Sequence, residues 1–446
     1  MPQIIKIELL ITKKLCYNLG RRDTMEYLNR VVDDEIKEKL SIVGAVQIKG
    51  PKWCGKTTSA KQIAKSILEM QNPDLQDNYI ELANTKPSLL LEGEKPRLID
   101  EWQIAPKLWN AVRYSVDNSG LTNQYILTGS ATPVDDDTLH SGVGRFAIVN
   151  MKPMSLFESK DSNGKISLLD LKNGKRDIDG IKTDLDYEKI AFVLCRGGWP
   201  NAINLSENNA LQIAKNYLDV LCNSDISKVD GVKRDPQLAR TILRSYARQV
   251  STIDSDSAMY KDIKANYADV SDTTIINYLK VLKRLYIIEE IEAWNPNIRS
   301  KTSIRTAPKK SFVDPSLAVA ALGCSKKELM LDINTFGLLF ENLVNRDLSI
   351  YASKIGGTLS HYRDRYDLEC DNIIHFEDGT YALVEIKLSG SRISEGENHL
   401  LQLKKLIDES DDIKVKPSLL MIITGTDMAY VTENDVLVVP IGCLKD

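Results

Sequence analysis

Short apolar runs alternate with helical segments through the first third of the chain. The apolar runs cover residues 45–48, 97–99 and 125–127, and apolar residues at helical spacing cover 57–71 and 106–116. Short apolar strands that alternate with helices are typical of a parallel α/β sheet. The sequence therefore predicts such a sheet as the first large folded unit.

The pattern changes twice in the rest of the chain. Residues 160–190 are rich in Lys, Asp, Gly and Ser, which predicts an excursion or a linker. The apolar period is helical at 208–221 and 235–249, and residues 262–294 predict a short helix, a turn, a longer helix and an apolar strand. Residues 311–446 return to a mixed α/β pattern.

Composition and charge exclude several classes of protein. The chain has 446 residues, 43% of them hydrophobic and 27% charged, and 58 Lys+Arg balance 62 Asp+Glu to a net charge of −4. This near balance excludes a globally basic nucleic-acid coat, though not a local basic face. Seven scattered cysteines without a CxxC pair and four histidines argue against a disulfide scaffold or a zinc module and fit a reducing cytosol. Without a long apolar run or a leader-like start, we expect a soluble, cytoplasmic protein with no membrane partner.

One segment fits the phosphate-loop pattern GxxxxGK[ST] without a mismatch, and it consists of Gly50, Pro51, Lys52, Trp53, Cys54, Gly55, Lys56 and Thr57. It follows a predicted strand and opens a helix, as the pattern requires. The two glycines let the loop curl, so that backbone N–H groups face a β-phosphate. Lys56 would neutralise phosphate oxygens, Thr57 would bind Mg²⁺ through its hydroxyl, and Thr58 stands where an α-phosphate contact is expected. The segment predicts ATP and Mg²⁺ as cofactors.

Two acids, Asp100 and Glu101, come at the end of the second apolar run. In a P-loop ATPase the first acid holds the magnesium-bound water and the second polarises the attacking water. The third run ends near Thr128 and Ser130, at the edge where ligands collect in parallel sheets. Either hydroxyl is a candidate for orienting the attacking water, and either fits an ordinary turn equally well.

Two arginines are candidates for sensing the nucleotide. Arg145 follows the glycine-rich stretch His140-Ser-Gly-Val-Gly144 and could be an arginine finger in cis or in trans, although a plain surface arginine fits nearly as well. A trans finger would require a second copy of the chain. Arg196 is a further candidate sensor. Trp53 could stack on adenine, but we expect it to pack over the loop.

Together these motifs resemble a bacterial and archaeal family of AAA+ ATPases whose C-terminal domain of unknown function looks like a PD-(D/E)xK nuclease fold. Further matching motifs are Cys195-Arg-Gly-Gly-Trp-Pro200, Asp314-Pro-Ser316, Leu339-Phe-Glu341 and Glu385-Ile-Lys387. The resemblance covers the chain from Met25 onward and implies Walker roles for Lys56, Thr57, Asp100 and Glu101. It implies no particular substrate.

Residues 262–286 predict a helix-turn-helix, with the turn at 270–271 and the second helix at 273–285. The buried stripe of that helix is expected at Ile276, Leu279 and Leu282, and its outer side at Lys280, Lys283 and Arg284. A wing hairpin is expected from 287–294 and 298–304.

Basic residues accumulate around this segment. Between residues 299 and 310 there are five and no acid, namely Arg299, Lys301, Arg305, Lys309 and Lys310. Upstream, three acids are outnumbered by Lys228, Lys233, Arg234, Arg240, Arg244 and Arg248. A basic winged helix would bind double-stranded DNA. Winged helices also serve as protein-interaction modules or lids, and basic patches also arise as solvated faces.

The C-terminal part predicts a hairpin that brings carboxylates together, provided that its register is right. A three-residue loop at 377–379, with Gly379 left-handed, would pair Asp371 with Glu385 and place Lys387 on the same face. A two-residue turn would scramble both faces, so we expect the three-residue loop. The other face is then uniformly apolar.

Two opposed carboxylates with a lysine nearby suit metal-dependent phosphodiester cleavage. Asp371 and Glu385 would hold Mg²⁺, Lys387 would stabilise the developing charge, and Glu341 or Glu369 could add a ligand. The alternative is a salt-bridged hairpin on a domain that binds but does not cut.

We therefore expect a tail at 1–24, an α/β AAA+-type P-loop domain at 25–204, a helical and winged-helix domain at 205–310, and a restriction-endonuclease-like α/β domain at 311–446. The leading hypothesis is a Mg²⁺-dependent ATPase that acts on or near double-stranded DNA. The alternatives are a nucleotide-gated switch that binds a protein partner, and an ATP-licensed nuclease. A homo-oligomer is possible if Arg145 acts in trans.

Overall fold

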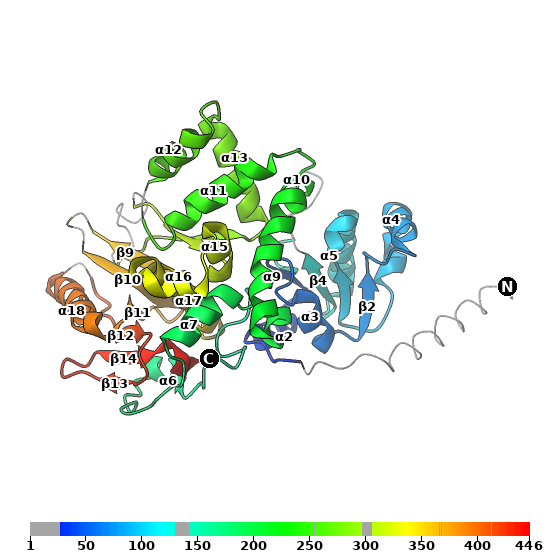
Figure 1. The fold of residues 1–446 in the computed structure, drawn as a ribbon. Helices are drawn as coiled ribbons and strands as arrows, with labels where there is room; N and C mark the ends of the chain where they lie inside the picture. Colours follow the sequence, from blue (N-terminus) through cyan, green and yellow to red (C-terminus); the bar gives the residue numbers. More distant parts are fainter. Residues whose placement is uncertain are drawn as a thin grey trace, which may run out of the picture.

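The computed structural model describes residues 27–129, 142–253, 255–296, 306–364, 366, 368–411 and 413–446. Figure 1 shows a first sheet, blue to cyan, on one side of the molecule and a second sheet, orange to red, on the other. Helices coloured green and yellow lie between and above the two sheets.

The first sheet has five parallel strands in the order β2-β3-β4-β1-β5. They are β1 Ala45–Lys49, β2 Ser66–Glu69, β3 Arg97–Asp100, β4 Tyr125–Gly129 and β5 Phe146–Asn150. The three predicted strands are confirmed as β1, β3 and β4. The helix predicted at 57–71 is wrong at its end, because α3 spans Lys56–Ile63 and the short edge strand β2 follows, with Leu68 in the core.

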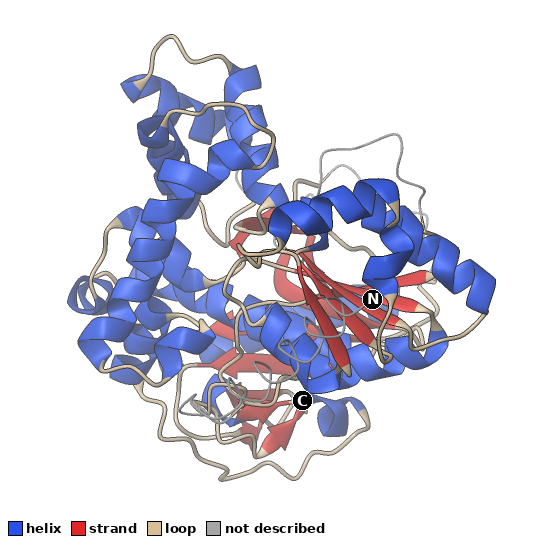
Figure 2. Cartoon of the chain, turned by 90° about the vertical axis from the view of Figure 1, so that its right-hand side faces the viewer, coloured by secondary structure: helices blue, strands red, loops and turns tan. Residues whose placement is uncertain are grey.

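Helices cover both faces of this sheet, as Figure 2 shows. One core joins α2 Val32–Ile42 and α3 to the strands, and the other joins α4 Gln76–Thr85 and α5 Lys107–Ser119 to their opposite side. Two 3₁₀ turns, Pro87–Leu91 and Trp102–Ile104, complete this part. Because all five strands are parallel, the loops after β1, β3 and β4 meet at one edge of the sheet.

The middle of the chain is helical, and its helices are α7 Tyr187–Arg196, α8 Pro200–Ile203, α9 Glu207–Val220, α10 Ile226–Lys228, α11 Pro236–Arg248, α12 Asp256–Asn266 and α13 Asp272–Arg284. A π-helical segment, Leu221–Asp225, joins α9 to α10. The predicted buried stripe of α13 is confirmed at Leu279 and Leu282 but wrong at Ile276, which is exposed, because Ile275 takes the core position.

The strands after α13 differ from the predicted wing. Strand β7 Ile288–Ile291 pairs antiparallel with β8 Lys309–Phe312, which lies further along the chain than the predicted returning strand. The whole predicted strand 298–304, with Arg299 and Lys301, lies outside the described residues, and so does Arg305. The helix and strand order suits a winged helix, which stays a prediction.

The second sheet has six strands in the order β13-β14-β12-β11-β10-β9. They are β9 Gly357–Arg363, β10 Glu369–Phe376, β11 Tyr381–Lys387, β12 Leu419–Thr424, β13 Tyr430–Val431 and β14 Leu437–Pro440. Strands β9, β10 and β11 are antiparallel neighbours, whereas β11, β12 and β14 are parallel. Helix α17 Ile333–Lys354 packs on one face of this sheet and α18 Ile393–Glu409 packs on the other. Two short helices, α15 Pro315–Leu322 and α16 Lys326–Leu331, precede α17 in the chain.

The predicted excursion folds onto the C-terminal part. Its strand β6 Ile166–Ser167 pairs with β15 Leu444–Lys445, and its helix α6 Leu168–Lys172 shares a core with residues as distant as Leu444. The boundary expected at residue 204 therefore does not coincide with a change of core. No helix among the described residues is long and apolar enough to cross a membrane.

Candidate nucleotide site and C-terminal charge cluster

The phosphate loop leaves the carboxyl end of β1 in an unusual backbone conformation. Gly50, Trp53 and Gly55 have φ of 151°, 64° and 104°. A left-handed tryptophan costs on the order of 1–2 kcal/mol, so the conformation persists only where surrounding contacts hold it. Gly50 has a packing reason as well, since a Cβ there would meet the Met151 carbonyl oxygen at 2.1 Å. The sequence thus folds this loop into a curled cradle before α3.

Lys56 holds the loop together, and Arg30 connects it to its surroundings. Lys56 Nζ is buried and donates to the carbonyl oxygens of Gly50 and Pro51, at 3.0 and 2.6 Å. Arg30 Nη1 donates to the Cys54 oxygen at 2.7 Å, and its Nε lies 3.0 Å from Glu158. Arg30 could not be predicted from the sequence, because it belongs to no motif and has no characteristic spacing to the phosphate loop. Of the other loop residues, Cys54 is buried and Thr58 is exposed.

Asp100, at the end of β3, contacts the start of α3 and the end of β4. Its Oδ1 accepts hydrogen bonds from Thr57 Oγ1 and from Thr128 Oγ1, each at 2.6 Å. The register that pairs Asp100 with Thr128 across β3 and β4 explains the second contact. Thr128 is fully buried and donates its hydroxyl hydrogen to Asp100, and its role in orienting the attacking water stays a prediction. Ser130 lies outside the described residues.

Glu101 adopts a left-handed conformation, with φ 54°, at the start of a 3₁₀ turn. Its carboxylate accepts a hydrogen bond from Gln103 Nε2. Non-glycine residues in this region are uncommon, and such strain gathers at functional sites. The geometry therefore sets Glu101 apart from an ordinary acidic turn.

Arg145 lies at the wrong edge of the sheet for a finger in cis. It directly precedes Phe146, the register partner of Ala45, whereas the phosphate loop begins after Lys49. A strand of this length separates the two edges by roughly 16 Å. Arg145 Nε instead binds Asp117 Oδ1 at 2.6 Å. A cis role is therefore incompatible with this placement, and a trans role stays a proposal.

Replacing Arg145 by alanine should leave ATP turnover at low protein concentration within about twofold of wild type, since the side chain is remote from the loop. The measurement is turnover against protein concentration for both proteins. A tenfold loss in the dilute variant would contradict the placement, whereas a loss confined to concentrated protein would support the trans role.

The remaining candidates near the loop have structural partners. Arg196 is buried and binds Asp161 through both terminal nitrogens, at 3.2 and 2.6 Å, so it does not face the loop as a sensor. Trp53 is 52% exposed, and its ring packs edge-on against the Tyr217 ring, with 5.9 Å between the ring centroids. Lys52 Nζ lies 2.8 Å from Asp225, in the π-helical segment. These contacts join the loop to α9 and the helix that follows.

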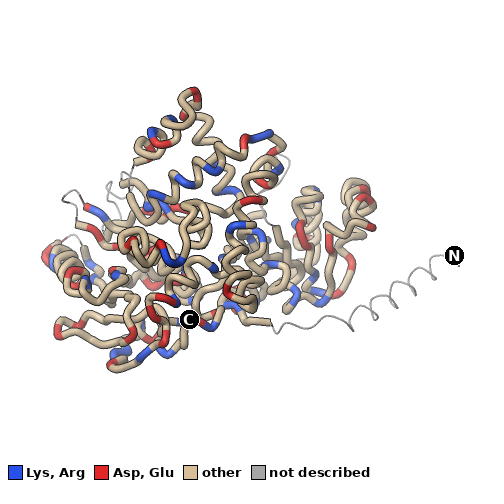
Figure 3. The backbone as a smooth tube through the Cα atoms, viewed as in Figure 1, with Lys and Arg blue, Asp and Glu red and all other residues tan. Residues whose placement is uncertain are grey.

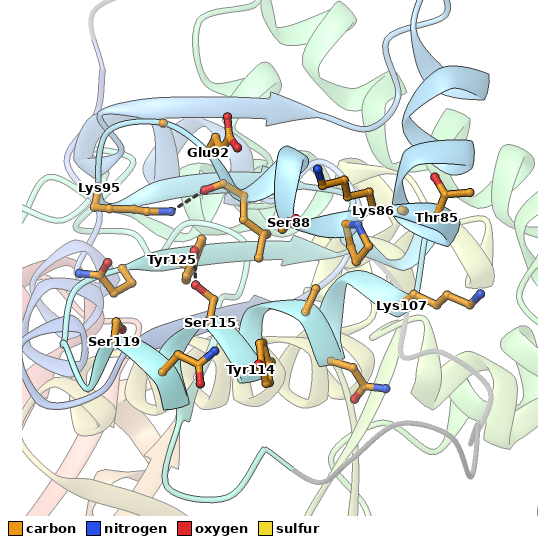
Figure 4. Close-up of a pocket in the computed structure, with 18 of the residues that line it drawn as sticks. Thr85, Lys86, Ser88, Glu92, Lys95, Lys107, Tyr114, Ser115, Ser119 and Tyr125 are labelled. Atoms are coloured by element: carbon orange, nitrogen blue, oxygen red, sulfur yellow. Dashed lines mark hydrogen bonds between the residues drawn. The ribbon is translucent and has the colours of Figure 1, made fainter.

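A cavity of about 1250 Å³ lies between α5 and the loop after α4, as Figure 4 shows. Lys95 Nζ there donates to the Leu91 oxygen at 2.7 Å and stands 3.7 Å from the centre of the Tyr125 ring. Burial lowers the pKa of Lys95 to about 8. No residue of the phosphate loop lines this cavity, and neither Asp100 nor Thr128 does. It is separate from the candidate nucleotide site.

The C-terminal hairpin has the predicted register. Asn372 pairs with Val384, and the Gly379 N–H donates to the Phe376 oxygen across a three-residue loop in which Gly379 has φ 82°. Asp371 therefore stands opposite Glu385. The predicted apolar face is confirmed, since Ile374, Phe376, Ala382, Val384, Ile386 and Leu388 share one buried core.

Five charged side chains form a cluster around Asp371, which we name the C-terminal charge cluster: Lys309, Glu341, Asp371, Glu385 and Lys387. Lys387 Nζ lies 2.6 Å from Glu385 and 3.6 Å from Asp371. Lys309 Nζ lies 2.6 Å from Glu341 and 3.8 Å from Asp371. Glu369, the other predicted ligand, binds Arg363 at 2.9 Å.

Burial and mutual charge shift the pKa values in this cluster. Burial raises the pKa of Glu341 to about 7, against the opposing effect of the Lys309 ammonium. Burial also acts to raise the pKa of Asp371, but Lys309 and Lys387 outweigh it and hold that pKa below its usual range. Burial and the Asp371 charge raise the pKa of Glu385. The two lysines therefore outweigh burial at Asp371 only.

The cluster does not fit a divalent cation as it stands. Among the described residues, no group of three His, Cys, Asp or Glu side chains is arranged to hold a metal ion. The sequence predicted three of the acids and one lysine of this cluster, but it counted Lys309 in the basic stretch 299–310 that supported DNA binding. In fact Lys309 and Lys310 are both buried.

Comparison with known proteins divides the chain into three segments. Residues 43–160 match the family described as an AAA domain, residues 187–328 match a domain of unknown function (DUF8612), and residues 336–444 match another (DUF4143). Residues 43–160 are therefore an AAA-like P-loop ATPase domain, in agreement with the resemblance seen in the motifs. The matches leave the nuclease-like assignment of the C-terminal part as a prediction.

Two relatives are named only as uncharacterized proteins, Mb2031c of Mycobacterium bovis and Rv2008c of Mycobacterium tuberculosis. Each is 24% identical over 376 residues, which cover 83% of this chain and 75% of the relative. Among solved structures, the Walker-type ATPase PABY2304 of Pyrococcus abyssi is 14% identical with a TM-score of 0.40, covering 67% of this chain and 97% of that one. A Thermotoga maritima RuvB variant is 17% identical with a TM-score of 0.26, covering 58% and 88%.

Proposed function

We propose that the protein is a Mg²⁺-dependent ATPase that acts on or near double-stranded DNA. Its nucleotide state would change the arrangement of the helices in the middle of the chain. The observation that carries the ATPase proposal is the junction at Asp100, whose Oδ1 accepts from both Thr57 and Thr128 beside the buried Lys56. In P-loop proteins Mg²⁺ is held by the hydroxyl at the start of the helix after the loop and by an aspartate at the end of a neighbouring strand.

Each residue has a proposed role. Backbone N–H groups of the loop from Gly50 to Gly55 would hold the phosphates, and Lys56 would leave its two carbonyl partners to neutralise phosphate oxygens. Thr57 and Asp100 would hold Mg²⁺, which supplies charge neutralisation at the phosphates when bound. Glu101, oriented by Gln103, would take the proton of the attacking water.

Coupling to the helices is supported by two contacts. The Lys52–Asp225 ion pair and the Trp53–Tyr217 ring contact both connect the phosphate loop to α9 and the π-helical segment after it. Single π-helical turns inside helices occur frequently at functional sites. A ligand that rearranges the loop would alter both contacts and shift the helices that lead to α13.

The DNA part of the proposal depends on the exposed side of α13. Thr273, Asn277 and Lys280 are exposed at helical spacing, as expected for a helix that enters a major groove. The upstream basic residues support DNA binding less well, because Arg234, Arg240 and Arg248 each bind an aspartate. Figure 3 shows Lys and Arg interspersed with Asp and Glu in this part of the chain.

A nucleotide-gated switch that binds a protein partner is the second candidate. It is favoured by the burial of Lys309 and Lys310 and by these arginine–aspartate pairs, which remove much of the expected basic face. An ATP-licensed nuclease is less well supported, because the C-terminal charge cluster does not fit a metal as it stands.

The test is ATP turnover of the wild type and of Glu101→Gln, each with and without double-stranded DNA. We expect Glu101→Gln to lower ATP turnover by about a hundredfold or more and to keep ATP binding, because the amide cannot accept a proton from the attacking water. Turnover that rises with DNA would support the DNA proposal. Turnover that ignores DNA would favour the switch, and unchanged turnover in the variant would refute the role of Glu101.

A further inference from the structure

Lys309 enters the C-terminal charge cluster from a part of the chain that precedes the C-terminal fold. It begins β8, the strand that pairs with β7 directly after α13. Its Nζ donates to Glu341 Oε1 at 2.6 Å and to the Asp371 carbonyl oxygen at 3.0 Å, and lies 3.8 Å from Asp371 Oδ1. The side chain is 4% exposed. A single cation thus bridges the acid on α17 and the acid on β10.

This position is the one that a metal ion held by the same acids would need. A divalent cation such as Mg²⁺ binds carboxylate oxygens at about 2.1 Å, and an ammonium between the same two carboxylates leaves neither the space nor the negative charge. On the other side of Asp371, Lys387 neutralises Glu385. Two lysines therefore face three carboxylates inside a buried cluster.

The neighbouring residue of β8 is also a buried lysine, and it contacts a different element. Lys310 lies 3.4 Å from Asp256, at the start of α12. Because successive side chains of a strand point to opposite faces, β8 contacts the C-terminal acids on one side and α12 on the other. Any movement of α12 and α13 that shifts β8 would therefore also pull on Lys309.

We propose that Lys309 is a built-in cation that takes the place of a divalent metal in the C-terminal charge cluster and latches β8 to the C-terminal fold. The cluster as folded is an electrostatic connection between the helical middle and the second sheet. It becomes a divalent-cation site only when Lys309 is removed or withdrawn. This inference does not depend on ATP hydrolysis.

The test is Mn²⁺ binding to the full chain without nucleotide, followed by the electron paramagnetic resonance signal of free Mn²⁺. Lys309→Met keeps an unbranched side chain that is one atom shorter and removes the charge. It should raise Mn²⁺ affinity roughly a hundredfold over wild type, since a unit charge within about 4 Å of the ion is lost. Lys310→Met is the matched control and should bind Mn²⁺ like wild type. The same added ion should raise the melting temperature of Lys309→Met alone.

A double variant, Lys309→Met with Asp371→Asn, locates the new site, because it should lose the gained affinity. Wild-type protein that already binds Mn²⁺ as tightly as Lys309→Met, and loses it on Asp371→Asn, would overturn the proposal. So would a gain that persists in the double variant. If Lys309→Met is insoluble, the wild-type and Asp371→Asn titrations decide alone: equal weak binding supports the lysine-filled cluster, and tight binding lost in Asp371→Asn refutes it.

Discussion

The Asp100→Asn variant is expected to lose ATP turnover by about a hundredfold or more. The Asp100 carboxylate accepts hydrogen bonds from Thr57 and Thr128 on one oxygen, both at 2.6 Å, which leaves its second oxygen for a cation or its water. Asparagine offers one acceptor oxygen and no charge. It would either keep the two threonine contacts and present an amide N–H to the cation, or turn around and lose both contacts.

Turnover under saturating Mg²⁺ and ATP checks this expectation, together with the rise in melting temperature on adding Mg²⁺ and ATP. The matched control is Asp117→Asn, because Asp117 is an aspartate of the same domain that binds Arg145 at the opposite edge of the sheet. Its turnover should stay close to wild type. An Asp100→Asn protein that turns over ATP normally would remove the basis of the proposed site.

The parts of the site that sequence predicts well are those set by local rules. The phosphate loop is one continuous segment, so residue type and spacing specify it directly. The hairpin register followed from alternation, because only the three-residue loop puts Ile374, Val384 and their neighbours on one apolar face. In both cases one short segment contains all the information that decides the geometry.

The parts that sequence could not predict depend on contacts between distant segments. Lys309 and Lys310 counted toward a basic stretch for DNA because residues 299–310 hold five basic residues and no acid, but the acids that bind Lys309 are at 341 and 371. Arg145 followed a glycine-rich stretch as a finger would, but a parallel strand starts at the edge away from the phosphate loop. Local charge counts do not show which edge or core a side chain reaches.

Two motifs, Cys195–Pro200 and Asp314–Ser316, meet beside Arg346 of α17. Asp314, at the start of α15, accepts from the Gly198 N–H at 2.9 Å, and Ser316 accepts from Trp199 Nε1 at 3.0 Å. Arg346, on the same helix as Glu341, donates to Asp314 Oδ2 at 2.8 Å. A Cβ on Gly197 would meet Ser316 Oγ at 2.4 Å, which explains the glycine. These motifs therefore hold the middle helices against α17.

Arg346→Met is expected to lower the free energy of unfolding by about 3–5 kcal/mol, the cost of removing one partner from a buried charge network. Arg346 binds both Asp314 and Asp347, at 2.8 and 2.7 Å, and all three side chains are at most 1% exposed. Burial raises the pKa of Asp347 to about 6 even with the arginine present. Without it, two buried carboxylates would remain with no cation between them.

Urea unfolding followed by tryptophan fluorescence measures this loss, since Trp199 is fully buried beside Ser316. The control is Arg392→Met, which breaks the exposed pair with Glu395 and should cost no more than about 1 kcal/mol. Equal losses in the two variants would mean that the buried network does not hold the helices to α17. A loss confined to Arg346→Met would identify the junction of the two motifs with Arg346 as structural. The Asp100 junction and the C-terminal charge cluster would then be the sites where function is to be sought.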